Sequence, residues 1–342
     1  MHRTGFSVRQ DYFMSNSRVL LRCLRLCLAT IVYLTATGAF ADTIRLAIQK
    51  TGTVAWELDV GRAHGLDKQT GLDIKAIELA SPEAGKIALR GGSTDVMVAD
   101  WLWVSRERDL GARLVFYPYS TALGAVMVKA DSPIRTLADL KGKSLAVAGG
   151  PIDKSWLLLA AAAKQQGIDL KQQATIVYGA PALLAGKMQQ GEMDAMLNYW
   201  NFCARLEAQG FRRLADIEDL LPKFGVKGKL SMIGYVFDEQ WAAAHRDTVA
   251  RFLDVTAKAK HILLTSDVEW ERIAPLTGAR DAAALKVYRD RYRQGIPDRP
   301  VEAEEADARV LYRVLAGLGG PALVGQGKEL APGTFYRPRA TE

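Results

Sequence analysis

Short apolar runs of β type alternate with longer amphipathic stretches from Asp42 onward, and this alternation limits the possible folds more than any other feature. It is the pattern of a parallel sheet with crossover helices. Gly65 ends the first amphipathic stretch, and Ser81-Pro82 begins the second with a capping residue and a proline. We therefore expect an α/β fold, with early strands at Thr43–Gln49, Asp73–Leu79, Asp95–Ala99 and Leu114–Tyr117.

The same pattern then starts again and predicts a second half-domain. Its expected strands are Ala125–Lys129, Ser144–Ala148, Thr175–Tyr178 and Ala195–Tyr199, and its main helices are Lys154–Gln166 and Pro181–Gln190. After Pro222 a single extended run, Leu230–Phe237, precedes a series of helical stretches. A lone strand followed by helices indicates that the chain returns to complete the first half. The Gly- and Pro-rich tail from Gly319 is expected to wrap over the surface.

The first 41 residues have the order of a secretory signal. Five arginines between Arg3 and Arg25 precede an apolar run from about Leu26 to Phe40, which ends in Ala39-Phe40-Ala41. A run of about 15 apolar residues is shorter than the roughly 20 that span a bilayer, so cleavage after Ala41 is favoured over a retained anchor. Either Met1 or Met14 serves as the start, and the mature protein is expected to be exported to the periplasm.

Removing this segment changes the meaning of the composition. The net charge of +7 falls by 4 to +3, so the main support for nucleic-acid binding is lost. Of three cysteines only Cys203 remains, which excludes an intramolecular disulfide and favours a buried small apolar residue. With 49% hydrophobic and 24% charged residues, the chain is a globular protein rather than a disordered one.

Candidate ligand-binding residues follow the expected strands, because ligands of open α/β sheets bind outside the carboxyl ends of the strands. Five of the seven tryptophans lie on these segments. Core packing is the favoured reading for each one singly, but packing alone would also scatter them through the helices. Helix capping is likewise an alternative role for Asp100 and Asp153. The predicted ligand-binding residues are Thr53, Trp56, Ser81, Asp100, Trp101, Tyr119, Gly150, Asp153, Trp156, Asn198 and Trp200.

The polar groups on these segments are mostly neutral or acidic, and Lys154 is the main cation. A nitrate or sulfonate site would depend on helix N-termini and cationic donors. Aromatic faces beside carboxylates instead suit a planar heterocycle or an organic cation. The residues therefore predict a nitrogen-containing aromatic or cationic solute, with a sulfonate- or nitrate-type anion as the alternative.

Several short segments, in order, resemble a known family. They are Ala63-His64-Gly65-Leu66, the segment from Ala88 to Val96, the segment from Ser132 to Lys143, the segment from Met188 to Ala195, Tyr235-Val236-Phe237 and the segment from His245 to Val249. In order and spacing they are similar to the periplasmic substrate-binding proteins of nitrate/taurine/sulfonate-type ABC importers, the SsuA/THI5-like family. The resemblance covers nearly all of Asp42–Leu318.

This resemblance implies a two-lobe periplasmic binding protein fold of type II. Lobe 1 would comprise residues 42–119 plus 234–342 and lobe 2 residues 120–233, with crossings near Ser120–Val128 and Leu230–Gly234. Such a protein closes around a small solute and delivers it to an ABC permease at the inner membrane. A monomer without a cofactor, metal or catalytic residue is expected.

Two other classes of protein remain as alternatives. Some relatives of this fold make a thiamine pyrimidine precursor, but His64, His245 and His261 lie in helical stretches away from the strand ends, and no cysteine cluster accompanies them. We therefore expect no enzyme activity. A periplasmic sensory or accessory binding module is not distinguished from an importer component. The acidic run Glu302, Glu304, Glu305 and Asp307 is expected to be a solvated helix face rather than a metal site.

Overall fold

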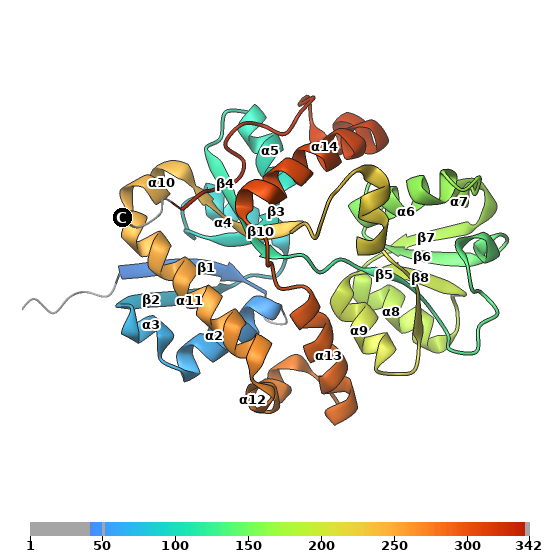
Figure 1. The fold of residues 1–342 in the computed structure, drawn as a ribbon, viewed down its shortest axis with the longest axis horizontal. Coiled ribbons are helices and arrows are strands. Elements are labelled where there is room, and N and C mark those ends of the chain that lie inside the picture. Colours follow the sequence, from blue (N-terminus) through green and yellow to red (C-terminus); the bar gives the residue numbers. More distant parts are fainter. Residues whose placement is uncertain (1–41, 50–51, 339–342) are drawn as a thin grey trace, which may run out of the picture. The chain divides into compact units, whose positions relative to one another are not determined.

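Three sheets organise residues 42–49 and 52–338, which are the residues that the computed structural model describes (Figure 1). The predicted signal segment, residues 1–41, lies outside them. β3 (Met97–Asp100), β10 (Ile233–Asp238) and β4 (Leu114–Ser120) form one sheet in the order β3-β10-β4. β1 (Asp42–Ile48) pairs with β2 (Leu72–Glu78), and a parallel bridge between Leu46 and Val96 joins β1 to the segment that leads into β3.

The second half of the chain forms a five-stranded sheet in the order β7-β6-β8-β5-β9. Its strands are β5 (Ala125–Val128), β6 (Ser144–Ala148), β7 (Thr175–Gly179), β8 (Ala195–Asn198) and β9 (Arg212–Asp216). β6 is parallel to β7 and β8, as the alternating pattern predicts. The polar sequence of β9 hides it from hydrophobic patterning, and it lies at the edge of the sheet, where charged strands are common.

Two strands depart from the expected parallel arrangement. β10 is antiparallel to both β3 and β4, and β5 is antiparallel to both β8 and β9. Both strands carry the chain from one sheet to the other, so neither is preceded by the crossover helix that a parallel neighbour needs. β10 nevertheless lies in the sheet of the first half, which confirms that the chain returns there.

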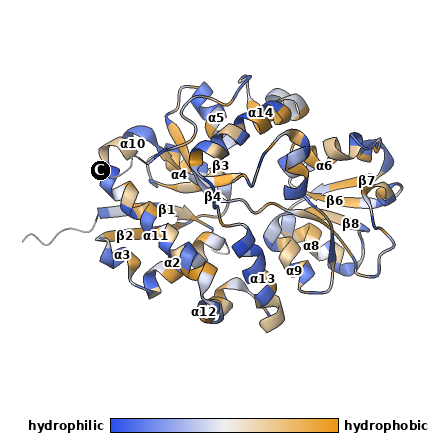
Figure 2. Cartoon of the chain, in the orientation of Figure 1, coloured by the Kyte–Doolittle hydropathy of each residue, from blue (hydrophilic) through white to orange (hydrophobic). Residues whose placement is uncertain are grey.

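Helices surround the sheets in both halves of the chain (Figures 1 and 2). In the first half they are α2 (Thr53–Ala63), α3 (Leu66–Gln69), α4 (Pro82–Arg90) and α5 (Trp101–Asp109). Around the five-stranded sheet lie η1 (Leu137–Leu140), α6 (Lys154–Lys164), α7 (Leu170–Gln173), α8 (Pro181–Gln190), α9 (Trp200–Glu207) and η2 (Glu218–Phe224). After β10 come α10 (Glu239–Ala244), α11 (Arg246–Thr265), α12 (Asp267–Thr277), α13 (Ala282–Gln294) and α14 (Val301–Val324). Within the described ranges, no helix has the length and apolarity that crossing a membrane requires.

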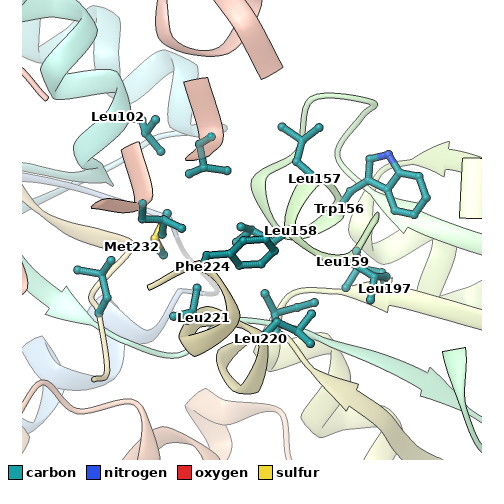
Figure 3. Close-up of a cluster of buried hydrophobic side chains, with 14 of the residues drawn as sticks. Leu102, Trp156, Leu157, Leu158, Leu159, Leu197, Leu220, Leu221, Phe224 and Met232 are labelled. Atoms are coloured by element: carbon teal, nitrogen blue, oxygen red, sulfur yellow. The ribbon is translucent and has the colours of Figure 1, made fainter. Parts of the chain in front are cut away.

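The largest apolar core joins the two main sheets. It contains Phe116 of β4, Leu158 of α6, Leu197 of β8 and Leu311 of α14. Figure 3 shows part of this cluster, where Phe224 of η2 lies beside Leu158 of α6. A second cluster fills the space between β1, β2, α2 and α11. Cys203 is fully buried in a third cluster, as predicted.

Two predictions for the C-terminal part are wrong. In the acidic run of α14, Glu304, Glu305 and Asp307 are buried rather than solvated, because Ser231 N donates to Glu304 Oε2 at 2.7 Å and Arg299 binds Asp307 at 2.7 Å. The tail is not a surface wrap. Phe335 is 5% exposed, and the amide of Phe116 donates to the carbonyl of Thr334 at 2.7 Å, so the tail extends the sheet beyond β4.

Candidate functional site

α4, α5 and α6 begin at the carboxyl ends of β2, β3 and β6, the strands that precede them. α4, α5 and α6 are capped by side chains: Ser81 accepts from Ala84 N at 3.2 Å, Asp100 from Trp103 N at 3.0 Å, and Asp153 from Ser155 N at 2.9 Å. Three predicted site residues therefore serve as N-caps, the alternative role that the sequence left open for Asp100 and Asp153. Their remaining polar atoms still lie at the strand ends.

A small pocket joins elements of both halves of the chain. Thr53, Tyr119 and Trp200, all predicted site residues, line it together with Glu57, Ser120, Ala122, Lys260, Tyr292, Gly295 and Ile296. Its volume of ≈ 10 Å³ corresponds to about one water molecule. The hydroxyls of Thr53 and Tyr119 lie 2.7 Å apart. In this arrangement the pocket has no room for a larger ligand.

A buried ionic network forms the floor of this pocket. Glu57 is 3% exposed and accepts from Lys260 Nζ at 2.5 Å, from Tyr292 OH at 2.5 Å and from Tyr235 OH at 3.2 Å. Desolvation lowers the pKa of Lys260 although Glu57 opposes the shift. Desolvation and the charge of Glu57 raise the pKa values of the surrounding tyrosines, including Tyr119, well above the ordinary value.

Sequence reasoning missed Glu57 and Lys260. Lys260 follows Lys258 on α11, and only the fold distinguishes the two, since Lys258 is exposed and paired with Asp254 on its own helix. A carboxylate on the amphipathic α2 likewise reads as a solvated residue. Hydrophobic periodicity does not reveal a buried ion pair, because each of its two residues resembles an ordinary surface charge in the sequence.

A second polar group lies between α5 and α6, whose preceding strands belong to different sheets. Lys154 Nζ lies 3.5 Å from Asp100 Oδ2, and the two side chains are 28% and 20% exposed. Tyr199 OH donates to Asp153 Oδ2 at 3.4 Å. Desolvation raises the pKa of Asp153, whereas for Asp100 the desolvation is outweighed by Lys154 and the Trp103 amide, which lower its pKa.

The other predicted site residues lie mainly inside the walls. Trp101 and Trp156 are fully buried, and Trp56 is 5% exposed and donates from Nε1 to the Leu276 carbonyl at 3.2 Å. Asn198 is buried and donates to the Pro181 carbonyl at 2.9 Å. Gly150 is half-buried beside Asp153. Some of the predicted residues thus line the pocket, some cap helices, and others pack inside the walls.

Exposed apolar side chains gather at the carboxyl edge of β6, β7 and β8. Ile152 precedes the cap of α6, Leu183 lies in the first turn of α8, and Tyr178 makes an edge contact with Trp156. These three and Tyr199 are 38–59% exposed. Ile152 precedes Asp153 in the chain and Tyr199 donates to it, so a ligand at Asp153 can cover exposed apolar surface.

The described residues contain no group of three His, Cys, Asp or Glu side chains that could hold a metal ion. His64 binds Glu269 at 3.1 Å, away from the strand ends. Burial raises the pKa of the Cys203 thiol to about 11, which disfavours the thiolate.

The model of the NMT1/THI5-like family matches residues 57–267, more than half of the chain. The chain belongs to the NMT1/THI5-like family. The comparison with curated protein sequences found no match.

Solved structures share the fold of this NMT1/THI5-like protein. The periplasmic aliphatic sulphonate binding protein SsuA from Escherichia coli is 21% identical with a TM-score of 0.68, over 88% of this chain and 94% of that one. The alkanesulfonate-binding protein SsuA from Xanthomonas axonopodis pv. citri, bound to MOPS, is 21% identical with a TM-score of 0.64, over 86% and 98%. The desulfurization enzyme DszB is 15% identical with a TM-score of 0.56, over 85% and 96%. The chain therefore has the predicted two-lobe fold of periplasmic binding proteins.

Proposed function

We propose that this protein is the periplasmic solute-binding component of an ABC importer. It captures a small organic solute between lobe 1, residues 42–119 plus 234–342, and lobe 2, residues 120–233, and as a monomer delivers it to an inner-membrane permease. The observation that carries the proposal is the opposition of strand ends from two sheets, where Lys154 meets Asp100 and where Thr53 and Trp200 line one pocket. Family membership and the SsuA-like fold support it.

The proposed binding residues have different tasks. Thr53, Tyr119 and Trp200 line the inner pocket, and Asp100 and Asp153 supply carboxylates between the lobes. Ser81 follows β2 and Gly150 follows β6. Trp56, Trp101, Trp156 and Asn198 support these groups from within the walls.

We propose a nitrogen-containing aromatic or cationic compound as the solute. The carboxylates of Asp100 and Asp153 attract a cation, and the exposed rings of Tyr178 and Tyr199 suit an aromatic body. The alternative, a sulfonate- or nitrate-type anion, is favoured by the N-termini of α2 and α9, for which the described residues provide no side-chain cap. The two similar SsuA structures are named as sulfonate-binding proteins, which also favours an anionic solute.

Calorimetry of residues 42–342 against matched panels of organic cations, aromatic heterocycles and sulfonates tests this function. We expect a cation or heterocycle to bind, with the affinity falling at least 10-fold in Asp100→Asn and unchanged in Asp254→Asn, which removes an exposed carboxylate of α11. Trp101→Ala tests the supporting wall. Binding of sulfonates alone would overturn the solute class, and binding of no solute would overturn the function.

Export and delivery have their own tests. N-terminal sequencing of the protein from a periplasmic extract should begin at Asp42, and retention of residues 1–41 would contradict cleavage. Solute-dependent stimulation of a permease and its ATPase in proteoliposomes separates an importer component from a sensory or accessory module, which would bind solute without supporting uptake.

We further propose that the protein is a binder and not an enzyme such as a thiamine-pyrimidine synthase. The fully buried Cys203, whose thiol donates to the Asn198 carbonyl, and the His64–Glu269 pair support this view, because both groups are engaged within the protein. Recovery of every bound solute unchanged after prolonged incubation is expected, and any turnover detected by mass spectrometry would contradict it.

A further inference from the structure

The contact between Lys154 and Asp100 joins α6 and α5, which follow strands of different sheets. Lys154 is the first residue of α6 and Asp100 is the N-cap of α5, so the contact tightens when the two lobes approach each other and breaks when they separate. The two side chains are mostly buried, which weakens screening by salt. A charge pair in this position favours the closed arrangement.

Lys154 interacts with two carboxylates. Burial opposes a raised pKa of Lys154, but the negative charges of Asp100 and Asp153 outweigh it and raise that pKa. Lys86 also lowers the pKa of Asp100, and its Nζ lies 3.9 Å from the exposed carboxylate of Glu83. Lys154 is the cation that acts on both carboxylates, whereas Lys86 acts on Asp100.

The lysine is also loosely held. Its distance of 3.5 Å from Asp100 Oδ2 is at the limit of a hydrogen bond, whereas the opposite oxygen of Asp100 is fixed by the Trp103 amide at 3.0 Å. A flexible four-carbon stem lets an ammonium group move away at small cost. The two carboxylates are in contrast fixed by their capping bonds, so they form a preformed acceptor for a positive charge.

We propose that Lys154 is an internal counter-ion that favours the closed arrangement, and that a cationic solute group binds in its place against Asp100 and Asp153. This inference rests on the proposed function. The exposed apolar groups beside Asp153, Ile152, Tyr178 and Tyr199, then cover the body of the solute. An anionic solute would instead use Lys154 as a donor, so the two solute classes predict opposite effects of removing this lysine.

The first test measures closure without any solute. Spin labels at Val268→Cys of α12 and Lys171→Cys of α7, both exposed positions on different lobes, report the interlobe distance by double electron–electron resonance. We expect Lys154→Gln to lower the closed-to-open ratio about 3- to 10-fold, as the loss of one partly buried ion pair implies. Lys258→Gln, which removes an equal charge from a pair within α11, should leave the ratio unchanged. An unchanged ratio in Lys154→Gln, or a wild-type protein that is open, overturns the counter-ion.

The second test measures competition, with benzamidine as the cationic probe and MOPS as the sulfonate probe. Benzamidine should bind Lys154→Gln about 3- to 10-fold more tightly than the wild type, because it no longer displaces a lysine. Weaker binding by the variant, no benzamidine binding by either protein, or wild-type MOPS binding that the variant loses overturns the displacement. If no solute of any panel binds while the closed-to-open ratio still shifts, the proposed function fails and the internal counter-ion stands.

Discussion

Single buried charges have large effects in this protein because their partners come from distant parts of the chain. Glu57 on α2 receives hydrogen bonds from α11, α13 and β10, which ties three later elements to the first helix. Burial of a carboxylate costs free energy unless hydrogen bonds and a counter-charge compensate it. The network therefore makes Lys260 essential for stability and keeps Thr53, four residues before Glu57 on α2, in place.

Replacing Lys260 by methionine should lower the free energy of unfolding by about 3 kcal/mol, since Glu57 would lose its counter-charge. Urea unfolding measures the loss. Lys258→Met on the same helix is the matched control and should change stability by no more than about 0.5 kcal/mol, because its pair with Asp254 is exposed. Equal losses in the two variants would contradict a special role for Lys260.

Glu304 should make stability depend on pH. Desolvation raises its pKa even though the amide of Ser231 donates to it at 2.7 Å. The folded protein thus binds this proton more tightly than the unfolded chain, so its contribution to stability decreases as the pH rises through and above the usual titration range of glutamate.

The measurement is the difference in unfolding free energy between the wild type and Glu304→Gln from pH 4 to pH 8. We expect the wild type to lose stability relative to the variant as the pH rises. A difference that is flat, or that has the opposite slope, would refute the raised pKa.

At the scale of elements, the segment between β4 and β5 depends on a close backbone approach. A Cβ atom at Gly124 would lie 1.8 Å from the carbonyl oxygen of Asn198, which is closer than atoms can pack. The glycine thus allows the crossing strand to pass directly against the end of β8, beside the proposed site.

Gly124→Ala should therefore destabilise the protein by about 3 kcal/mol, since the backbone must shift to admit the methyl group. Gly186→Ala in α8 is the control, because a Cβ there meets nothing within 4 Å. It should increase stability by about 0.5–1 kcal/mol through the helix propensity of alanine. Thermal melts compare the two, and a stable Gly124→Ala would contradict the close approach.

The starts of some helices could be predicted because their capping residues are visible in the sequence. The caps Ser81 and Asp153 begin α4 and α6 near the positions expected from the sequence. The burial of Glu304 and Asp307 was not predictable in this way, because the crossing segment that covers them is about 80 residues away in the sequence. Periodicity describes a helix face but does not say what packs on it.

At the scale of the whole molecule, one apolar cluster links the two main sheets. Leu158 of α6 and Phe224 of η2 belong to the same cluster as Phe116 and Leu311 (Figure 3). Lobes that share a core should unfold together.

Differential scanning calorimetry should accordingly show a single transition with equal calorimetric and van't Hoff enthalpies. Leu158→Ala should lower the free energy of unfolding by about 2–5 kcal/mol without splitting the peak. Two separate transitions in the wild type would show that the lobes are energetically independent.

The sequence by itself determined the α/β alternation, the second half-domain and the return of the chain at β10, because each of these depends on hydrophobic periodicity and turn residues within one segment. It also pointed to the strand ends where Thr53, Asp100 and Trp200 lie. Only the tertiary structure decided that Glu57 pairs with Lys260, that Lys154 reaches Asp100, and that most of the tryptophans pack inside the walls. These contacts join residues from about 50 to 200 positions apart, and the free energy of such a pair depends on burial and distance, which no local pattern contains.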